Sequence, residues 1–193
     1  AARLKLGPGV IADRFEKVTI LFADIADFTP LSEQMAPEAL VNLLNAIFSE
    51  FDDLADKYGV EKIKTIGDAY MAVAGLPERL EDHAQPAAEM ALDMMNAMEH
   101  FNSDLGAPIQ LRIGINSGPV VAGVIGKRKF AYDLWGDAVN TASRMGSHGL
   151  PGEIQVSKAT YDLLKDSYCF EERETIDIKG KGPMAVFLLN RRN

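Results

Sequence analysis

Residues 61–73 carry the clearest folding signal of the chain and read Glu61-Lys62-Ile63-Lys64-Thr65-Ile66-Gly67-Asp68-Ala69-Tyr70-Met71-Ala72-Val73. Two runs rich in β-branched and aromatic residues flank a Gly-Asp pair, which is typical of a tight hairpin turn. We therefore predict a hairpin with strands at 60–66 and 69–75 and with Asp68 in its turn. Turn preference alone would account for Asp68, so a structural and a functional interpretation both stay open at this point.

A second aspartate, Asp24, ends the apolar run of residues 18–23, which predicts a buried strand over 17–23. The run from Ala23 to Thr29 places two acids, Asp24 and Asp27, among apolar side chains rather than in a polar loop. A carboxylate at a strand end is held by the sheet yet reaches solvent, and two such groups together suit Mg²⁺. Asp24 and Asp68 therefore suggest phosphate chemistry.

The order of the remaining elements is typical of an α+β sandwich. We expect helices at 37–58, 84–102, 137–147 and near 158–165, and strands at 109–115, 120–125, near Ile154, at 170–178 and at 185–190. The strands at 109–115 and 120–125 would be joined through Ser117-Gly118-Pro119. The fold class is then a ferredoxin-like or palm-like sandwich, a mostly antiparallel sheet with helices packed on it. One domain is expected over residues 15–193, after a linker at 1–14.

Composition narrows the class of protein further. A formal net charge of −8 argues against a general nucleic-acid binder, which would need a basic field. No run approaches the roughly 20 apolar residues that span a bilayer, so we expect no membrane segment in this stretch and a cytoplasmic location. The first residues read as a cut end or a linker, which leaves room for a membrane or sensory segment upstream. The single cysteine, Cys169, fits a reducing compartment.

Several cationic and amide side chains could meet an anionic ligand. Asn140 and Arg144 lie four residues apart on one face of the helix expected at 137–147. Lys64 and Arg112 sit within strands, where alternation favours the solvent face for each residue taken singly. Residues 178–183 form a lysine-glycine turn that could close over a phosphate, although it lacks the Walker pattern.

Taken together, these segments resemble the catalytic domain of class III nucleotidyl cyclases, the adenylate and guanylate cyclase family. The similarity runs from about Phe15 to Arg191 and is greatest to bacterial, particularly mycobacterial, cyclases akin to the mammalian membrane enzymes. The matching motifs are Leu21-Phe22-Ala23-Asp24-Ile25, Lys62-Ile63-Lys64-Thr65-Ile66-Gly67-Asp68-Ala69-Tyr70-Met71, Arg112-Ile113-Gly114-Ile115, Gly123-Val124-Ile125-Gly126, residues 132–145 and Lys179-Gly180-Lys181-Gly182.

The resemblance implies a two-metal phosphoryl transfer. Asp24 and Asp68, with the carbonyl of Ile25, would bind two Mg²⁺ per site, with Mn²⁺ as an alternative metal. Asn140 would orient the ribose, and Arg144 would stabilise the transition state. The substrate phosphates would be bound by Arg112, by Lys179 and by the turn that contains Phe28 and Thr29.

The same resemblance implies the base and the assembly. Lys64 and Asp133 occupy the positions at which adenylate cyclases carry a Lys and an Asp, so ATP is the expected substrate and cyclic AMP the product. A guanylate or mixed-specificity cyclase, and a weakly active nucleotide-binding module, are the alternatives. Family active sites lie between two subunits, so a head-to-tail homodimer is expected. Asp27 stands where the family usually has Gly, and it would need an unusual backbone conformation or weaken nucleotide binding.

Overall fold

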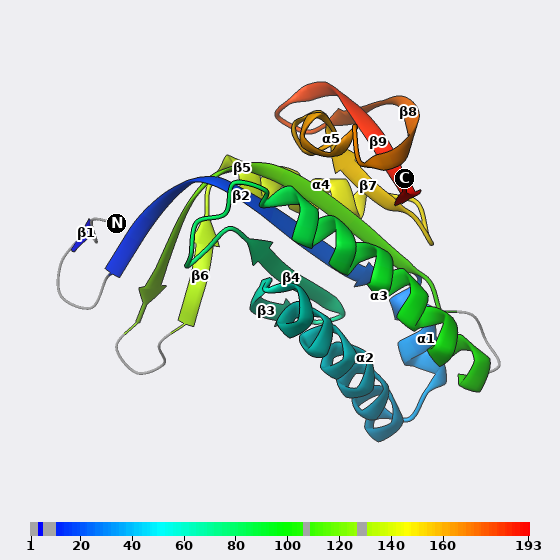
Figure 1. The fold of residues 1–193 in the computed structure, drawn as a ribbon. Coiled ribbons are helices and arrows are strands. Elements are labelled where there is room, and N and C mark those ends of the chain that lie inside the picture. Colours follow the sequence, from blue (N-terminus) through cyan, green and yellow to red (C-terminus); the bar gives the residue numbers. More distant parts are fainter. Residues whose placement is uncertain (1–3, 6–10, 106–108, 127–130) are drawn as a thin grey trace.

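The computed structural model describes residues 4–5, 11–105, 109–126 and 131–193. Figure 1 shows a long, arched sheet with long helices beneath it; the C-terminal part of the chain, in orange and red, lies above the arch and adds strands to the same sheet. In chain order the elements are β1 (Leu4–Lys5), β2 (Ile11–Ile25), α1 (Phe28–Gln34), α2 (Pro37–Tyr58), β3 (Glu61–Ile66), β4 (Ala69–Ala74), α3 (Ala84–Leu105), β5 (Leu111–Ile125), β6 (Ala131–Trp135), α4 (Asp137–Ser147), β7 (Ile154–Ser157), α5 (Lys158–Leu164), β8 (Tyr168–Ile178) and β9 (Gly182–Arg192).

The described strands form a single sheet in the order β3-β4-β2-β5-β7-β9-β8, with β1 paired to β2 and β6 paired to β5. Among the described pairings, β5 with β7 is parallel and the others are antiparallel. The predicted fold class, a mostly antiparallel sheet with helices packed on it, is therefore confirmed.

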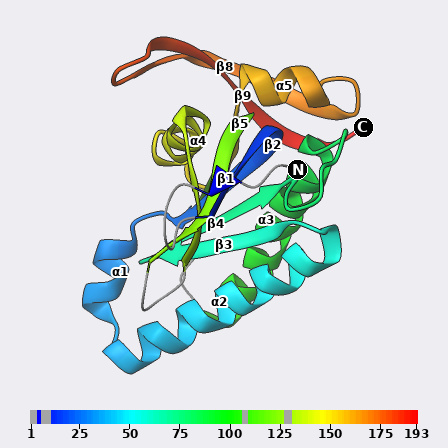
Figure 2. The ribbon, with the colours of Figure 1, turned by 90° about the vertical axis from the view of Figure 1, so that its left-hand side faces the viewer.

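Side chains of β2 alternate between two cores. Leu21, Ala23 and Ile25 belong to the larger core, which they share with buried residues of α2 and α3. Val18 and Ile20 face the other way, into a smaller core that contains Ala138 and Ala142 of α4. Figure 2 shows α4 and α3 on different sides of the central strands. Both faces of this sheet are covered, which explains why residues 18–23 are apolar except for the buried Thr19.

The helix predicted at 37–58 is confirmed, with Pro37 in its first turn. Its buried positions are Leu43, Ile47, Phe51 and Ala55, a spacing of four that defines one face. The second helix, predicted at 84–102, continues to Leu105. The hairpin at 61–74 and the helix at 137–147 also match the predictions.

The prediction of two strands at 109–115 and 120–125 is wrong, because β5 runs unbroken from Leu111 to Ile125. Ser117 and Gly118 pair with β2, and the register shifts on β2 between Phe15 and Val18. Pro119 therefore falls opposite a bulge, where its missing N–H leaves no ladder bond unmade. The sheet therefore has a bulge at the position where the sequence predicted a turn.

Three elements were not predicted from the sequence. Strand β1 has two residues and lies within the predicted linker, and helix α1 has seven residues, too few for a periodic pattern. Strand β6 is continuous, but Asp133 interrupts the apolar run of its sequence. The closing strands are longer than the predicted 170–178 and 185–190, since they cover Tyr168–Ile178 and Gly182–Arg192. The predicted linker, residues 1–14, overlaps β2, which begins at Ile11; residues 1–3 and 6–10 lie outside the described part of the chain.

Candidate active site

The two aspartates singled out from the sequence lie at one end of the central strands. Asp24 is the penultimate residue of β2 and is paired with Ala69, the residue that follows Asp68 in the β3–β4 turn. The Asp68 carboxylate accepts a hydrogen bond from the backbone N–H of Ile25, with 3.3 Å between nitrogen and oxygen. Two carboxylates and the backbone of Ile25 thus meet at a solvent-facing edge, and such oxygen donors suit a hard divalent cation.

The carboxyl of Asp24 is partly buried and lies near charges of both signs. Burial raises the pKa of its carboxyl, Arg112 opposes that rise by a hydrogen bond and by its charge, and the nearby Asp68 adds to it. The Arg112 Nε lies 3.0 Å from the Asp24 Oδ1, and the two residues face each other across β2 and β5. Because the carboxylates repel each other in a partly desolvated place, the site favours a cation. Within this chain, the guanidinium of Arg112 is the cation that contacts Asp24.

The turn after β2 contains Asp27 in a left-handed conformation, with φ 56° and ψ 37°. Asp27 is the one non-glycine residue with positive φ in the described part of the chain. The unusual backbone expected from the sequence is therefore present, and Asp is among the side chains that tolerate it. Phe28, the first residue of α1, packs against the larger core, whereas Thr29 is exposed.

Lys64 and Asp133 form an ion pair. The Lys64 Nζ lies 2.7 Å from the Asp133 Oδ2, and the other oxygen of Asp133 accepts a hydrogen bond from the N–H of Leu134. The side chains are 41% and 22% exposed, so a ligand can still reach the pair. A donor and an acceptor are thereby presented side by side, as a base edge would need them.

The side chains of Asn140 and Arg144 lie on the face of helix α4 that points away from the core. Ala138, Ala142 and Met145 are buried, while Asn140 is exposed and Arg144 is partly exposed. Neither polar side chain hydrogen-bonds another group in the described ranges, so both are available to a ligand. The sequence had left the orientation of this face open.

The end of α4 lies directly on β5. A Cβ atom placed on Gly114 would come within 1.9 Å of the backbone nitrogen of Gly146. The two backbones therefore touch with no side chain between them, and this contact sets the depth at which α4 packs. The amide of Asn116 holds the other end of α4 by donating to the carbonyl of Ala138, at 3.0 Å.

The lysine-glycine turn joins β8 and β9. Lys179 is exposed and has no partner among the described residues, whereas the Lys181 ammonium pairs with the carboxylate of Asp137 in the first turn of α4. This pair was not predicted from the sequence. The complementary charges are the only sequence signal, and they are 44 residues apart.

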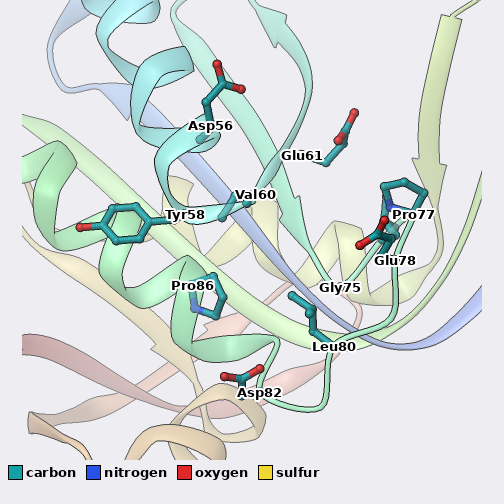
Figure 3. Close-up of a pocket in the computed structure, with 13 residues that line it drawn as sticks. Asp56, Tyr58, Val60, Glu61, Gly75, Pro77, Glu78, Leu80, Asp82 and Pro86 are labelled. Atoms are coloured by element: carbon teal, nitrogen blue, oxygen red, sulfur yellow. The ribbon is translucent and has the colours of Figure 1, made fainter.

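A cavity of about 640 Å³ opens at the far end of the β3–β4 hairpin from Asp68, next to Glu61 and Gly75 (Figure 3). Its charged lining residues are all acidic: Asp56, Glu61, Glu78 and Asp82. An acidic lining repels a triphosphate. None of the sequence-predicted site residues lines this cavity, so it is not their binding site.

The chain is similar to known proteins over nearly its whole length. Residues 10–191 match the model of the adenylate and guanylate cyclase catalytic domain, and the chain belongs to that family. It is 48% identical over 180 residues to an adenylate cyclase of Mycobacterium bovis, covering 93% of this chain and 41% of that protein. The chain therefore spans about two-fifths of that relative's length.

Solved structures of both specificities are similar to the chain. The guanylate cyclase domain of RhGC from Catenaria anguillulae, in complex with GTP, is 40% identical with a TM-score of 0.90, over 94% of this chain and 100% of that one. The adenylyl cyclase CyaB from P. aeruginosa is 32% identical with a TM-score of 0.89, over 94% and 97%. The fold is thus shared by enzymes for either nucleotide, and substrate choice must be argued from side chains.

Two further observations concern the described residues. None of their helices is both long enough and apolar enough to cross a membrane. They also contain no group of three or more His, Cys, Asp or Glu side chains arranged for a metal, so the predicted metal site has two carboxylates in one chain. Domains of this family use divalent metals in general.

Proposed function

We propose that this domain is an adenylate cyclase, which converts ATP to 3′,5′-cyclic AMP and pyrophosphate. The observation that carries the proposal is the Lys64–Asp133 pair, 2.7 Å apart. Adenine offers ring-nitrogen acceptors and an amino donor, which match an ammonium and a carboxylate. Guanine presents a carbonyl and a ring N–H instead, so part of the pattern would be left unpaired. The mycobacterial relative named an adenylate cyclase supports the same choice.

In the reaction, the ribose 3′-hydroxyl gives up its proton to solvent and its oxygen forms a bond to the α-phosphorus, while the bond from that phosphorus to the bridging oxygen of the β-phosphate breaks and pyrophosphate leaves. Asp24, Asp68 and the Ile25 carbonyl would hold two Mg²⁺, or Mn²⁺. When bound, these ions lower the pKa of the 3′-hydroxyl and neutralise the triphosphate. The oxygen-only donor set and the raised pKa of Asp24 support this assignment, since both indicate a site that favours a cation.

The remaining residues would act on ribose and phosphate. Arg144, which is partly exposed on α4 and unpaired among the described residues, would stabilise the charge that develops on the equatorial oxygens. Asn140, on the same face, would orient the ribose. Arg112 and Lys179 would bind the terminal phosphates, together with the turn that contains Phe28 and Thr29.

We also infer that the active site is completed by a second copy of the chain, in a head-to-tail homodimer with two equivalent sites. Metal aspartates from one subunit would face Lys64, Asp133, Asn140 and Arg144 of the other. Large apolar side chains are exposed beside both halves: Ile66 near Asp68 is 53% exposed, and Tyr132 and Trp135 flank Asp133 at 37% and 39%. Exposed apolar groups around a functional surface support a protein contact there.

Because ATP is abundant in the cytoplasm, we place the domain in the cytoplasm.

The test is a cyclic nucleotide assay on the isolated domain with ATP or GTP, in Mg²⁺ or Mn²⁺, for the wild type and for Asp24→Asn. We expect cyclic AMP as the main product, and the variant should lose at least about 10²-fold in kcat. Cyclic GMP as the main product would make the domain a guanylate cyclase. Nucleotide binding without either product would reduce it to a regulatory module.

A further inference from the structure

The β8–β9 turn is tied to α4 at two places. At its base, Ile178 and Val186 are fully buried against Met145 of α4. At its tip, the ammonium of Lys181 pairs with the carboxylate of Asp137. The turn itself is closed by a hydrogen bond of 2.9 Å from the N–H of Lys181 to the carbonyl of Ile178. Its shape and its position on α4 are therefore both defined.

Asp137 stands on the reactive face of α4. It precedes Asn140 by three residues and Arg144 by seven, and such positions lie along one side of a helix. The pair with Lys181 consequently places the turn at the N-terminal end of the same face that carries Asn140 and Arg144. Lys179, two residues before Lys181, is left exposed and without a partner in the described ranges.

We propose that Asp137 is a positioning residue, which docks the Lys179–Gly182 turn through Lys181 so that Lys179 can reach the phosphates beside Arg144. The two lysines of the turn then have different tasks: Lys181 is the anchor and Lys179 is the ligand. The proposal rests on the proposed function for the identity of the ligand. It does not need that function for the docking itself, which is a property of the nucleotide-free chain.

The first experiment measures docking without catalysis. Hydrogen–deuterium exchange of the nucleotide-free domain is compared for the wild type, Asp137→Asn and Lys158→Met, the last of which breaks an exposed pair with Asp162 on α5. We expect faster exchange of residues 179–182 in Asp137→Asn alone. Unchanged exchange in that variant would overturn the proposal, whatever the activity of the domain.

The second experiment is a double-mutant cycle on the steady-state kinetics with ATP. Asp137→Asn and Lys181→Met should each raise KM about two- to five-fold, the range expected for one partly exposed ion pair, with little change in kcat. The double variant should be no worse than either single variant, and Asp137→Glu should restore the KM. Additive effects, or a large loss of kcat in Lys181→Met alone, would show that Lys181 itself contacts the substrate and would overturn the proposal. Absence of any product from the wild type would instead refute the proposed function.

Discussion

Lys64 on β3 and Asp133 on β6 form an ion pair between two strands that are not hydrogen-bonded to each other. Strand β3 pairs with β4, and β6 pairs with β5, and the curvature of the sheet brings strands β3 and β6 close to each other (Figure 1). The pair therefore reports on tertiary structure, and it places the donor and the acceptor for a base at a fixed separation.

Exchanging this pair should exchange the substrate. In Lys64→Glu with Asp133→Gly, an acceptor replaces the donor and the carboxylate is removed, so the pocket loses its match to adenine and gains one to guanine. We expect the ratio of kcat/KM for ATP to that for GTP to fall on the order of 100-fold. Lys62→Glu is the matched control, because Lys62 lies on the same strand but pairs with Asp52. Retained ATP preference in the double variant would refute the role of the pair.

The head-to-tail arrangement predicts complementation between two inactive variants. Asp24→Asn removes a metal ligand and Arg144→Ala removes the transition-state cation, so each homodimer should be inactive. In an equal mixture, half of the dimers are mixed, and each of these has one intact site. About a quarter of the wild-type activity should return. No recovery after verified subunit exchange, or an active monomer in sedimentation, would show that the site lies within one chain.

Asp27 predicts opposite effects of two small substitutions on stability. Its φ of 56° suits glycine, so Asp27→Gly should raise the free energy of unfolding by about 0.5 kcal/mol. Asp27→Ala should lower it by about 1 kcal/mol, because alanine does not tolerate this region. For a domain of 193 residues the shifts are a few degrees in Tm.

Both Asp27 variants remove a negative charge near the proposed triphosphate site, so both should lower the KM for ATP. The comparison therefore separates charge from backbone strain. Equal stability of the two variants would contradict the left-handed conformation. An unchanged KM in both would show that the Asp27 carboxylate does not face the nucleotide.

Much of this domain could be predicted because its signals are local. The period of α2, the hairpin at 61–74 and the apolar run that ends at Asp24 each depend on neighbouring residues, and each was found. The errors lie where a distant residue decides. Pro119 suggested a turn, but the bulge at Phe15/Val18 on the adjacent strand lets β5 continue through it.

The candidate site shows the same difference between local signals, which could be predicted, and contacts between distant residues, which could not. Candidate side chains were identified by type and by the family resemblance, whereas their partners in space were not. The contacts of Arg112 with Asp24, of Lys64 with Asp133 and of Lys181 with Asp137 join residues 88, 69 and 44 positions apart. Only the fold brings such charges together, and a single sequence holds no local pattern that would pair them.

Two glycines at one contact should respond differently to alanine. A Cβ on Gly114 would lie 1.9 Å from the backbone of Gly146, so Gly114→Ala must push α4 off the sheet and should cost about 3 kcal/mol or more. A Cβ on Gly146 has its nearest neighbour at 3.6 Å, and alanine favours the helix, so Gly146→Ala should stabilise by about 0.5 kcal/mol. Chemical denaturation of both variants checks this, and similar effects of the two would contradict the close packing of α4 on β5.

His83 predicts an acid-sensitive fold. It is 5% exposed, and its Nδ1 lies 2.7 Å from the hydroxyl of Thr19, which in turn contacts Ser117. Burial lowers the pKa of His83 from its usual 6.5, and the charge of Lys17 adds to this. The unfolded chain therefore takes up the proton at a higher pH than the folded one. The stability that neutral His83 contributes is complete above pH 6.5 and is lost as the pH falls from there towards the lower pKa of the folded state.

Thermal unfolding measured between about pH 7.5 and pH 5.5 checks this sign, because the interval spans the ordinary pKa of histidine. We expect the Tm of the wild type to fall more steeply with acid than that of His83→Gln, which keeps a polar partner for Thr19 and cannot be charged. His148→Gln, at an exposed position after α4, should follow the wild type. If His83→Gln and the wild type showed parallel pH curves, His83 would be protonated equally in both states, and its burial would have no energetic consequence for the fold.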